Sequence, residues 1–354
     1  QKIQGYETPD GSHQQFMIAQ GPQLHQKLAN LTLESAGSYM LNLGTVYFQL
    51  GDEGTARELL DLAWKDRSSV LEPDDPQLLT VRDRMADLEL AQGSLDKAEE
   101  YVSGYVTACA KKLGTQSEEY IRGCSTLGEI AQRKGRFARA DSLFRISIAA
   151  SERKADKDTD VVLALTLQRR AKSSSAQGHH PEAIADLSRA REVMVHTYDS
   201  SHYKVAAIDI LIAEAAYHAG DHTASLRASN LALHTLDARV RALEADKRPK
   251  TFADPHLLPD ALYWKVKAER ALRPNASDTQ WGKDLDLAIA SLSRNKAAVQ
   301  DEASKLLLVG AQERLFDLAM DVAYDAYAAK PGDASVERFL SIAEADRAIL
   351  LKER

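Results

Sequence analysis

Residues 127–140 read LGEIAQRKGRFARA, a pattern that predicts two helices joined by a glycine turn. Gly135 can adopt the left-handed backbone conformation that ends one helix and lets the chain reverse. Gly128 precedes it by seven residues and Ala140 follows it by five. Both are small enough to let two helices cross closely, while Leu127 fills the space beside the crossing. The stretch therefore predicts an antiparallel helix pair.

The turn glycine recurs at a nearly fixed interval along the chain. Consecutive turn glycines are 42 or 43 residues apart, and four of them are followed five residues later by an Ala. A fixed period of this length is typical of stacked helix pairs rather than of one compact core. The chain has 354 residues, which is more than an ordinary single core holds. The turn glycines are Gly51, Gly93, Gly135, Gly178 and Gly220.

This pattern resembles the tetratricopeptide repeat, in which small residues mark the crossing of two helices. The ordinary unit has about 34 residues. Here the additional residues lie in polar links between units, such as 71–76 and 198–202, which makes the unit similar to the longer repeat of kinesin light chains. The resemblance implies an all-α, right-handed superhelix of antiparallel helix pairs, an α-α solenoid.

We expect five parts along the chain. Residues 1–21 form an irregular lead-in, and residues 22–236 hold the five repeats. Residues 237–259 form a helix extension and a basic inserted loop, which is either a docking element for an acidic partner or a solvated charged loop. Residues 260–330 form degenerate repeat-like helices, and residues 331–354 form a helix that leads into a C-terminal domain outside this chain.

Two further helices are expected after the basic loop. The apolar period predicts a first helix over residues 257–272 and a second over residues 285–299. The intervening residues 273–283, which include a Pro, an Asn and a Gly, are expected to form a loop.

The C-terminal part carries a second resemblance. Residues 284–289 read DLDLAI, residues 301–307 read DEASKLL, residues 336–340 read VERFL and residues 343–351 read AEADRAILL. They resemble the repeat region that precedes a CHAT domain, a caspase-like cysteine peptidase module, in bacterial proteins. The resemblance implies that the His/Cys dyad belongs to a domain that follows, so no catalytic residue is carried over to this chain. The residues that match the final helix are Glu344, Ala345, Arg347, Ala348, Leu350 and Leu351.

This resemblance implies a function in protein recognition. The chain is expected to be the recognition or regulatory arm of a CHAT-family peptidase, which binds an activator or a substrate protein. The alternative is a stand-alone scaffold or adaptor with no attached enzyme. The presence or absence of coding sequence beyond Arg354 separates the two.

Neither a catalytic site nor a cofactor is expected in the chain itself. The sequence has no Gly-rich phosphate loop, and neither Cys109 nor Cys124 stands in a catalytic motif. His218 and His222 are four residues apart, but Gly220 separates them, so they do not share a helix face that could hold a metal.

The charge balance limits the choice of partners. The net charge is −7, with 45 Lys and Arg against 52 Asp and Glu, which argues against direct binding of nucleic acid. No apolar run approaches the roughly 18 residues of a membrane span. Because the chain starts at Gln1 rather than Met, a secreted or periplasmic form stays open beside the favoured cytoplasmic one.

The first helix of each repeat is expected to line a peptide-binding groove. Four carboxylates and two cations among the predicted positions make this groove mildly acidic, so a polar or basic peptide is the favoured ligand. The Lys, Asn and Arg set with which some tetratricopeptide proteins bind a C-terminal carboxylate is not reproduced. The predicted groove residues are Phe48, Asp83, Asp87, Arg122, Glu129, Gln132, Gln168, Lys172, Glu214 and Tyr217.

Overall fold

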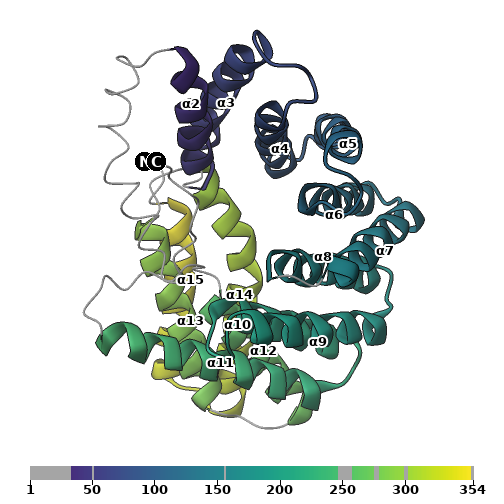
Figure 1. The fold of residues 1–354 in the computed structure, drawn as a ribbon. Helices are drawn as coiled ribbons and strands as arrows, with labels where there is room; N and C mark the ends of the chain where they lie inside the picture. Colours follow the sequence, from purple (N-terminus) through teal and green to yellow (C-terminus); the bar gives the residue numbers. More distant parts are fainter. Residues whose placement is uncertain are drawn as a thin grey trace. The chain divides into compact units, whose positions relative to one another are not determined.

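The protein is helical throughout the residues that the computed structural model describes. These are residues 33–49, 52–154, 157–245, 257–274, 279–298 and 302–351. They form fourteen α-helices, and no strand occurs among them (Figure 1). The all-α solenoid of helix pairs predicted from the sequence is confirmed. The predicted lead-in, residues 1–21, lies outside the described residues, as does Gly51.

The helices divide into two compact units, residues 1–177 and residues 178–354. The division falls at the turn of the fourth predicted repeat. Unit 1 contains α2 (Leu33–Gln49), α3 (Glu53–Ser68), α4 (Pro76–Ala91), α5 (Leu95–Lys112), α6 (Glu118–Arg133), α7 (Phe137–Lys154) and α8 (Lys157–Ala176). Unit 2 contains α9 (His180–Thr197), α10 (Tyr203–His218), α11 (His222–Ala245), α12 (Leu257–Leu272), α13 (Thr279–Ala298), α14 (Glu302–Ala329) and α15 (Asp333–Leu351).

The predicted turn glycines adopt the conformation that their role requires. Gly93, Gly135, Gly178 and Gly220 all have a positive φ, between 70° and 81°. A residue with a Cβ is strained in this left-handed region, whereas Gly is not. The backbone N–H of Gly135 also donates to the Gln132 carbonyl, which helps to close the end of α6. The sequence pattern therefore located these turns correctly.

The small residues lie where two helices of a pair cross. A Cβ on Gly128 would come within 2.5 Å of the Phe144 ring, and one on Gly44 within 3.1 Å of the Leu60 side chain. Ala56 and Ala140, five residues after their turns, are fully buried. The helices of a pair approach this closely only because these positions carry little or no side chain.

Within unit 1 the helices alternate between two sides of a layer. Each helix packs against the next one in the chain, and α2 also contacts α4 while α6 contacts α8. Figure 1 shows α2, α4, α6 and α8 along the inner side of this unit, with α3, α5 and α7 behind them. We call the surface of α4, α6 and α8 on this side the inner face. It is built from the first helix of successive repeats, as the sequence predicted.

Unit 2 follows the same alternation and has a continuous apolar core. Sequential helices from α9 to α15 pack on one another, and α12 also contacts both α10 and α14. Buried residues from α10 through α15 form one cluster, which includes Trp264, Trp281, Phe316 and Ile342. The degenerate repeats at the end of the chain thus bury their apolar residues in the same way as the regular ones.

The basic segment 237–259 is helical at its start. Helix α11 continues to Ala245, so residues 237–245 form the helix extension that was expected at the start of this segment. Residues 246–256, which contain Lys247, Arg248 and Lys250, lie outside the described part of the chain. Its role as a docking element or a solvated segment stays a prediction.

The predicted loop over residues 273–283 is longer than the real one. Helix α13 begins at Thr279, six residues before the predicted start at Leu285. The extra turns are held by tertiary contacts, because the Trp281 indole is buried and donates a hydrogen bond of 2.7 Å to Glu269 of α12. Packing therefore overrides the weak helix propensity of Gly282.

The crossing at Gly128 gives a direct test of the packing. We expect Gly128→Ala to lower the free energy of unfolding by about 1–3 kcal/mol, because the new methyl group overlaps the buried Phe144 ring. Gly54→Ala is the matched control: its Cβ would meet nothing closer than 3.8 Å, so stability should be unchanged or rise by up to about 1 kcal/mol. Urea unfolding measures both. Equal effects of the two substitutions would contradict the close crossing.

Candidate functional site

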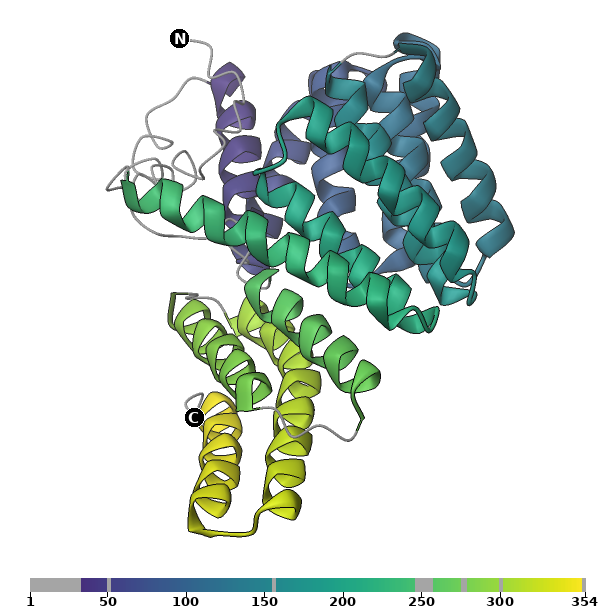
Figure 2. The same ribbon diagram turned by 90° about the horizontal axis from the view of Figure 1, so that it is seen from below.

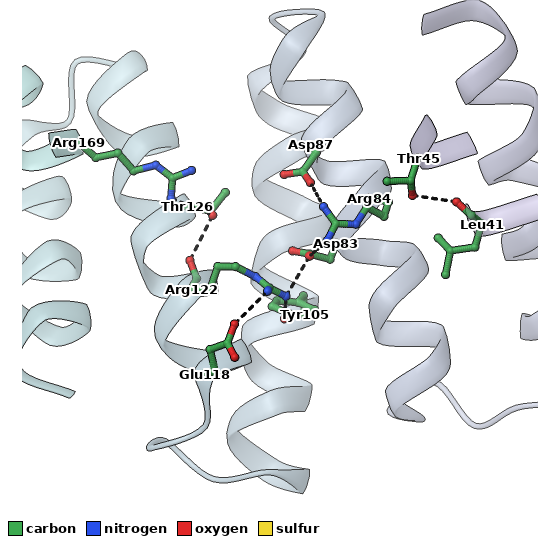
Figure 3. Close-up of polar contacts among 10 residues, drawn as sticks. All are labelled: Leu41, Thr45, Asp83, Arg84, Asp87, Tyr105, Glu118, Arg122, Thr126 and Arg169. Atoms are coloured by element: carbon green, nitrogen blue, oxygen red, sulfur yellow. Dashed lines mark hydrogen bonds and ion pairs between the residues drawn. The ribbon is translucent and has the colours of Figure 1, made fainter. Parts of the chain in front are cut away.

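The inner face of unit 1 carries a network of charged side chains. The network runs from α4 through α6 to α8, and Figure 3 shows the contacts between α4 and α6 together with the Arg169 side chain of α8. Each of these helices contributes at least one Arg. The charged members are Asp83, Arg84 and Asp87 from α4, Glu118, Arg122, Glu129 and Arg133 from α6, and Arg169 from α8.

The first link of the network joins α4 to α6. One Nη atom of Arg122 lies 3.2 Å from an Asp83 carboxylate oxygen and donates to the Tyr105 hydroxyl at 3.0 Å, while the other lies 3.4 Å from Glu118. Burial lowers the pKa of the Arg122 guanidinium, but Asp83 and Tyr105 raise it by more, so its pKa lies above its ordinary value. Arg122 is therefore held as a cation beside Asp83, which is almost fully buried.

The second link joins α6 to α8. The Arg169 Nε lies 2.8 Å from a Glu129 carboxylate oxygen, and an Nη atom donates to the hydroxyls of Ser125 and Thr126 at 2.9 and 3.3 Å. Burial lowers the pKa of Arg169, and the nearby Glu129 acts against this. Arg133 lies 3.1 Å from the same Glu129. One carboxylate thus holds two guanidinium groups.

Arg133 also connects back to α4. It donates to the backbone carbonyl of Leu90 at 2.9 Å, close to the C-terminal end of that helix. A cation at this end satisfies a carbonyl that has no partner within the helix and interacts favourably with the helix dipole. The three first helices of these repeats are therefore joined by side chains as well as by apolar packing.

Asp87 differs from the other carboxylates of the inner face. Its carboxylate accepts a hydrogen bond of 2.8 Å from Arg84, and a third of the side chain is exposed. Burial and the neighbouring Asp83 raise the pKa of Asp87 to about 6, although Arg84, Arg122 and Arg169 act to lower it. The nearby cations therefore do not fully compensate the negative charge of Asp87.

The structure brings several of the predicted groove residues together. Asp83, Asp87, Arg122 and Glu129 lie in one network, and Gln132 and Gln168 are half-buried on the same helices. Lys172 is exposed on α8. The prediction that these residues form a binding surface is not tested by their placement.

Other predicted groove residues lie elsewhere. Phe48 of α2 packs against an apolar cluster that contains Leu60 and Leu88, so it contributes to the core of the first repeats. Glu214 and Tyr217 belong to α10 of unit 2. The ring centroids of Tyr217 and Trp264 are 5.6 Å apart, and the Lys267 ammonium group lies over the Tyr217 ring. These two residues therefore do not belong to the inner face of unit 1.

The sequence prediction omitted three of the cations in the network, Arg84, Arg133 and Arg169. A signal was present, because Asp83 and Arg122 are 39 residues apart and Glu129 and Arg169 are 40 apart. Both separations are slightly shorter than the repeat of 42 or 43 residues. They place an acidic residue on the first helix of one repeat opposite an Arg on the first helix of the next repeat.

Cys109 and Cys124 are both buried. Burial raises the pKa of the Cys109 thiol to about 11 and also raises that of Cys124. Among the described residues, no group of three or more His, Cys, Asp and Glu side chains is placed to hold a metal ion. No helix in this part of the chain has the length and apolar character needed to cross a membrane.

Paired helices with small residues at their crossings define the inner face as part of a tetratricopeptide-type solenoid. In agreement, residues 35–103, from α2 into α5, match the tetratricopeptide-repeat family model. This stretch is therefore a tetratricopeptide-repeat region. It includes Asp83, Arg84 and Asp87 of the inner face.

Solved structures show the same fold at low sequence identity. The apo form of RapI is 12% identical, with a TM-score of 0.56 over 89% of this chain and 98% of RapI. The apo form of the quorum sensor NprR from B. thuringiensis is 14% identical, with a TM-score of 0.53 over 97% of this chain and 94% of NprR. BtubC (BKLC) from P. vanneervenii is 16% identical, with a TM-score of 0.51 over 68% of this chain and 95% of BtubC.

One short stretch is similar to an enzyme. Fifty residues, 14% of the chain, are 50% identical to part of the crotonyl-CoA carboxylase/reductase of Cereibacter sphaeroides. The match spans only 12% of the length of that protein. A similarity of this extent carries no activity over to the chain.

The second link of the network can be tested by removing its cation. We expect Arg169→Gln to lower the free energy of unfolding by about 2–3 kcal/mol, because it leaves the largely buried Glu129 with one guanidinium instead of two and removes the hydrogen bonds to Ser125 and Thr126. Arg145→Gln breaks an exposed pair with Asp141 and should cost less than about 1 kcal/mol. Thermal and urea unfolding provide the comparison, and similar losses for the two variants would count against the network.

The raised pKa of Asp87 predicts a particular pH dependence. The folded state keeps a proton on Asp87 up to about pH 6, whereas the unfolded chain releases it near the ordinary pKa of 3.8. The contribution of Asp87 to stability is therefore full below about pH 4 and is lost as the pH rises through 6, by about 1–2 kcal/mol after allowance for its partial exposure.

Asp87→Asn should remove this decline in stability. The check is the difference in unfolding free energy between wild type and variant from pH 4 to pH 7, with Asp141→Asn as the control. A constant difference for Asp87→Asn would contradict the raised pKa.

Proposed function

We propose that the chain is a protein–protein interaction scaffold and that the inner face of unit 1 binds a segment of a partner protein. Stacked helix pairs expose one long surface built from equivalent helices, and proteins of this architecture use such surfaces for binding. The inner face offers hydrogen-bonding groups from Gln132 and Gln168 and charges from Asp87 and Lys172. These side chains are at least partly accessible and come from three successive repeats.

The observation that carries the proposal is the placement of Asp87, whose side chain is one third exposed on the inner face beside the almost fully buried Asp83. The raised pKa of Asp87 agrees with this placement. Its pKa of about 6 means that the surrounding groups do not fully stabilise the negative charge. A cationic side chain from a partner would supply the missing stabilisation, whereas a carboxylate would add to the repulsion from Asp83. The proposed ligand is therefore a polar or basic segment, with a Lys or Arg placed near Asp87.

The rest of the network supports binding by holding the face in shape. Arg122 and Arg169 are engaged by carboxylates of the chain itself, so they keep their positions before a ligand arrives. A surface whose side chains are already ordered loses less conformational entropy when it binds. Asp87, Gln132 and Gln168 then provide the groups that contact the partner.

A phage-displayed library of random peptides provides the test. Peptides selected on the protein at neutral pH should be enriched in Lys and Arg and should lose at least about tenfold in affinity with Asp87→Asn or Gln168→Ala. Asp141→Asn, on α7, should have no effect. Selected peptides that bind all these variants equally would exclude the inner face, while acidic peptides that still depend on Gln168 would exclude only the proposed charge of the partner.

A second candidate is that this scaffold serves as the regulatory arm of a CHAT-family peptidase. It is supported by the sequence resemblance over residues 284–351. In the structure, Arg338 of α15 pairs with Asp286 of α13 at 2.9 Å, so two of the resembling segments are in contact. By this account, a partner on the inner face would regulate a following peptidase through a change in the curvature of the solenoid or in its packing on that domain.

The two forms of the proposal are separated by the coding sequence downstream of the codon for Arg354. A continuation into a domain with a paired His and Cys, and a peptidase activity that changes when an inner-face peptide is added, would support the regulatory arm. A stop codon close to Arg354 would favour the stand-alone scaffold.

A further inference from the structure

The last two helices of unit 2 expose large apolar side chains. Tyr324 and Tyr327 belong to the last two turns of α14, and Val336, Phe339 and Leu340 belong to the first two turns of α15. Between 37% and 63% of the surface of each of these side chains is exposed. Large apolar residues scattered singly over a surface are ordinary, but several in one place mark an interaction site. We call these five residues the hairpin patch.

The five residues lie at the same end of one helical hairpin. Helices α14 and α15 pack side by side and are joined by the short turn at residues 330–332, which lies at the lower edge of Figure 2. In an antiparallel hairpin, residues at similar distances from the turn are neighbours. Val336, Phe339 and Leu340 are also spaced by three and four residues, as on one side of a helix.

The hairpin patch is separate from the core of unit 2. Leu315, Phe316 and Val322 of α14 and Ile342 of α15 are buried in the continuous apolar cluster. These residues use the opposite sides of the two helices to attach the hairpin to the rest of the unit. The exposed apolar residues are therefore additional to those that the fold requires.

The repeating architecture indicates what fits the hairpin patch. Earlier in unit 2, the pair α10 and α11 is covered by α12, and the pair α12 and α13 is covered by α14. Each apolar face of a helix pair is thus closed by one further helix. An apolar face of a helix pair that no further helix covers leaves its large side chains exposed. The pair α14 and α15 presents the kind of surface on which this unit packs a helix.

The charges around the hairpin patch indicate the character of that helix. Exposed carboxylates on the same two helices outnumber the exposed cations. Asp321 and Asp325 of α14 share Arg270 of α12. Near the turn, Lys330 is exposed, and Arg338, which is one third exposed, pairs with Asp286 of α13. Among the residues of the two helices whose side chains are described, the further exposed acidic residues are Glu313, Asp317, Asp333, Glu337 and Glu344.

We propose that the hairpin patch binds an amphipathic helix of a partner protein, whose apolar stripe covers Tyr324, Val336 and Leu340 and whose flanking Lys and Arg residues face the carboxylates of α14 and α15. The helix adds one more layer to the stack of unit 2. The acidic residues around it select basic flanks and reject acidic ones. This site belongs to unit 2 and does not depend on the inner face of unit 1.

Two synthetic helical peptides test the proposal. Both carry the same Leu stripe, one with Lys and the other with Glu on its flanks. The Lys peptide should bind the protein at least about tenfold more tightly than the Glu peptide, measured by fluorescence anisotropy at low ionic strength, and the difference should shrink as salt is added. Equal binding of the two peptides would overturn the charge selection.

Matched surface variants show whether binding occurs at the hairpin patch. Leu340→Ser and Val336→Ser should each weaken the Lys peptide by about fivefold or more, since each removes one exposed apolar contact. Leu62→Ser and Leu231→Ser, at positions 49% and 44% exposed in α3 and α11, are the controls and should change nothing. Because all four side chains are largely exposed, circular dichroism should show folded protein in every case.

Two results would overturn the assignment. One is a Lys peptide whose affinity falls equally with Leu231→Ser and Leu340→Ser, which would indicate general attraction to an acidic protein. The other is a chain that sediments as a dimer, becomes monomeric with Leu340→Ser and binds neither peptide. In that case the hairpin patch would be covered by a second copy of the chain.

Discussion

The structure depends on the close crossing of two helices within each pair. Gly128 lies against the Phe144 ring with no room for a Cβ, and Gly44 lies against Leu60, which would have to shift to admit one. The small residues on the opposite helix, such as Ala140, are fully buried. Because every repeat crosses at the same point, the first helices of successive repeats come to one side, and this side is where the charged network lies.

Two ion pairs of the charged network follow the repeat, because each joins the first helix of one repeat to the first helix of the next. Asp83 of α4 faces Arg122 of α6, and Glu129 of α6 faces Arg169 of α8, so an acid on one helix meets an Arg on the next equivalent helix. Partly buried charges of this kind cost desolvation energy and are stable only when paired and hydrogen-bonded. Asp87 is the exception, since its raised pKa shows that its charge is not fully compensated. An otherwise balanced face thus has one position that favours a cation.

The sequence was sufficient for the elements that depend on local conformation and on side-chain size. Gly93, Gly135, Gly178 and Gly220 have the positive φ that a turn requires, and the alanines that follow them by five residues in the second, third and fourth pairs are buried, because both properties belong to single positions. The start of α13 was missed because it depends on the burial of Trp281 and on its hydrogen bond to Glu269, which is a tertiary effect. Asp83 and Glu129 were named as binding residues, but their pairing with Arg122 and Arg169 depends on the register between repeats.

The two proposed surfaces have different physical origins. The inner face of unit 1 consists of charged and amide groups held by ion pairs, and its selectivity comes from one poorly compensated carboxylate. The hairpin patch of unit 2 consists of exposed aromatic and aliphatic groups with acidic surroundings, and its affinity would come from apolar burial. A scaffold with both could hold two unlike partner segments independently.

The most direct measurement of the central claim, that ion pairs join successive first helices into one ordered face, is a double-mutant cycle between Asp83 and Arg122. The unfolding free energies of wild type, Asp83→Asn, Arg122→Gln and the double variant give the coupling energy of the pair. The structure predicts a favourable coupling of about 1–3 kcal/mol, since Asp83 is nearly buried and the guanidinium also binds Tyr105. A coupling below about 0.3 kcal/mol would show that the Asp83–Arg122 ion pair does not help to join the two helices and would contradict the account.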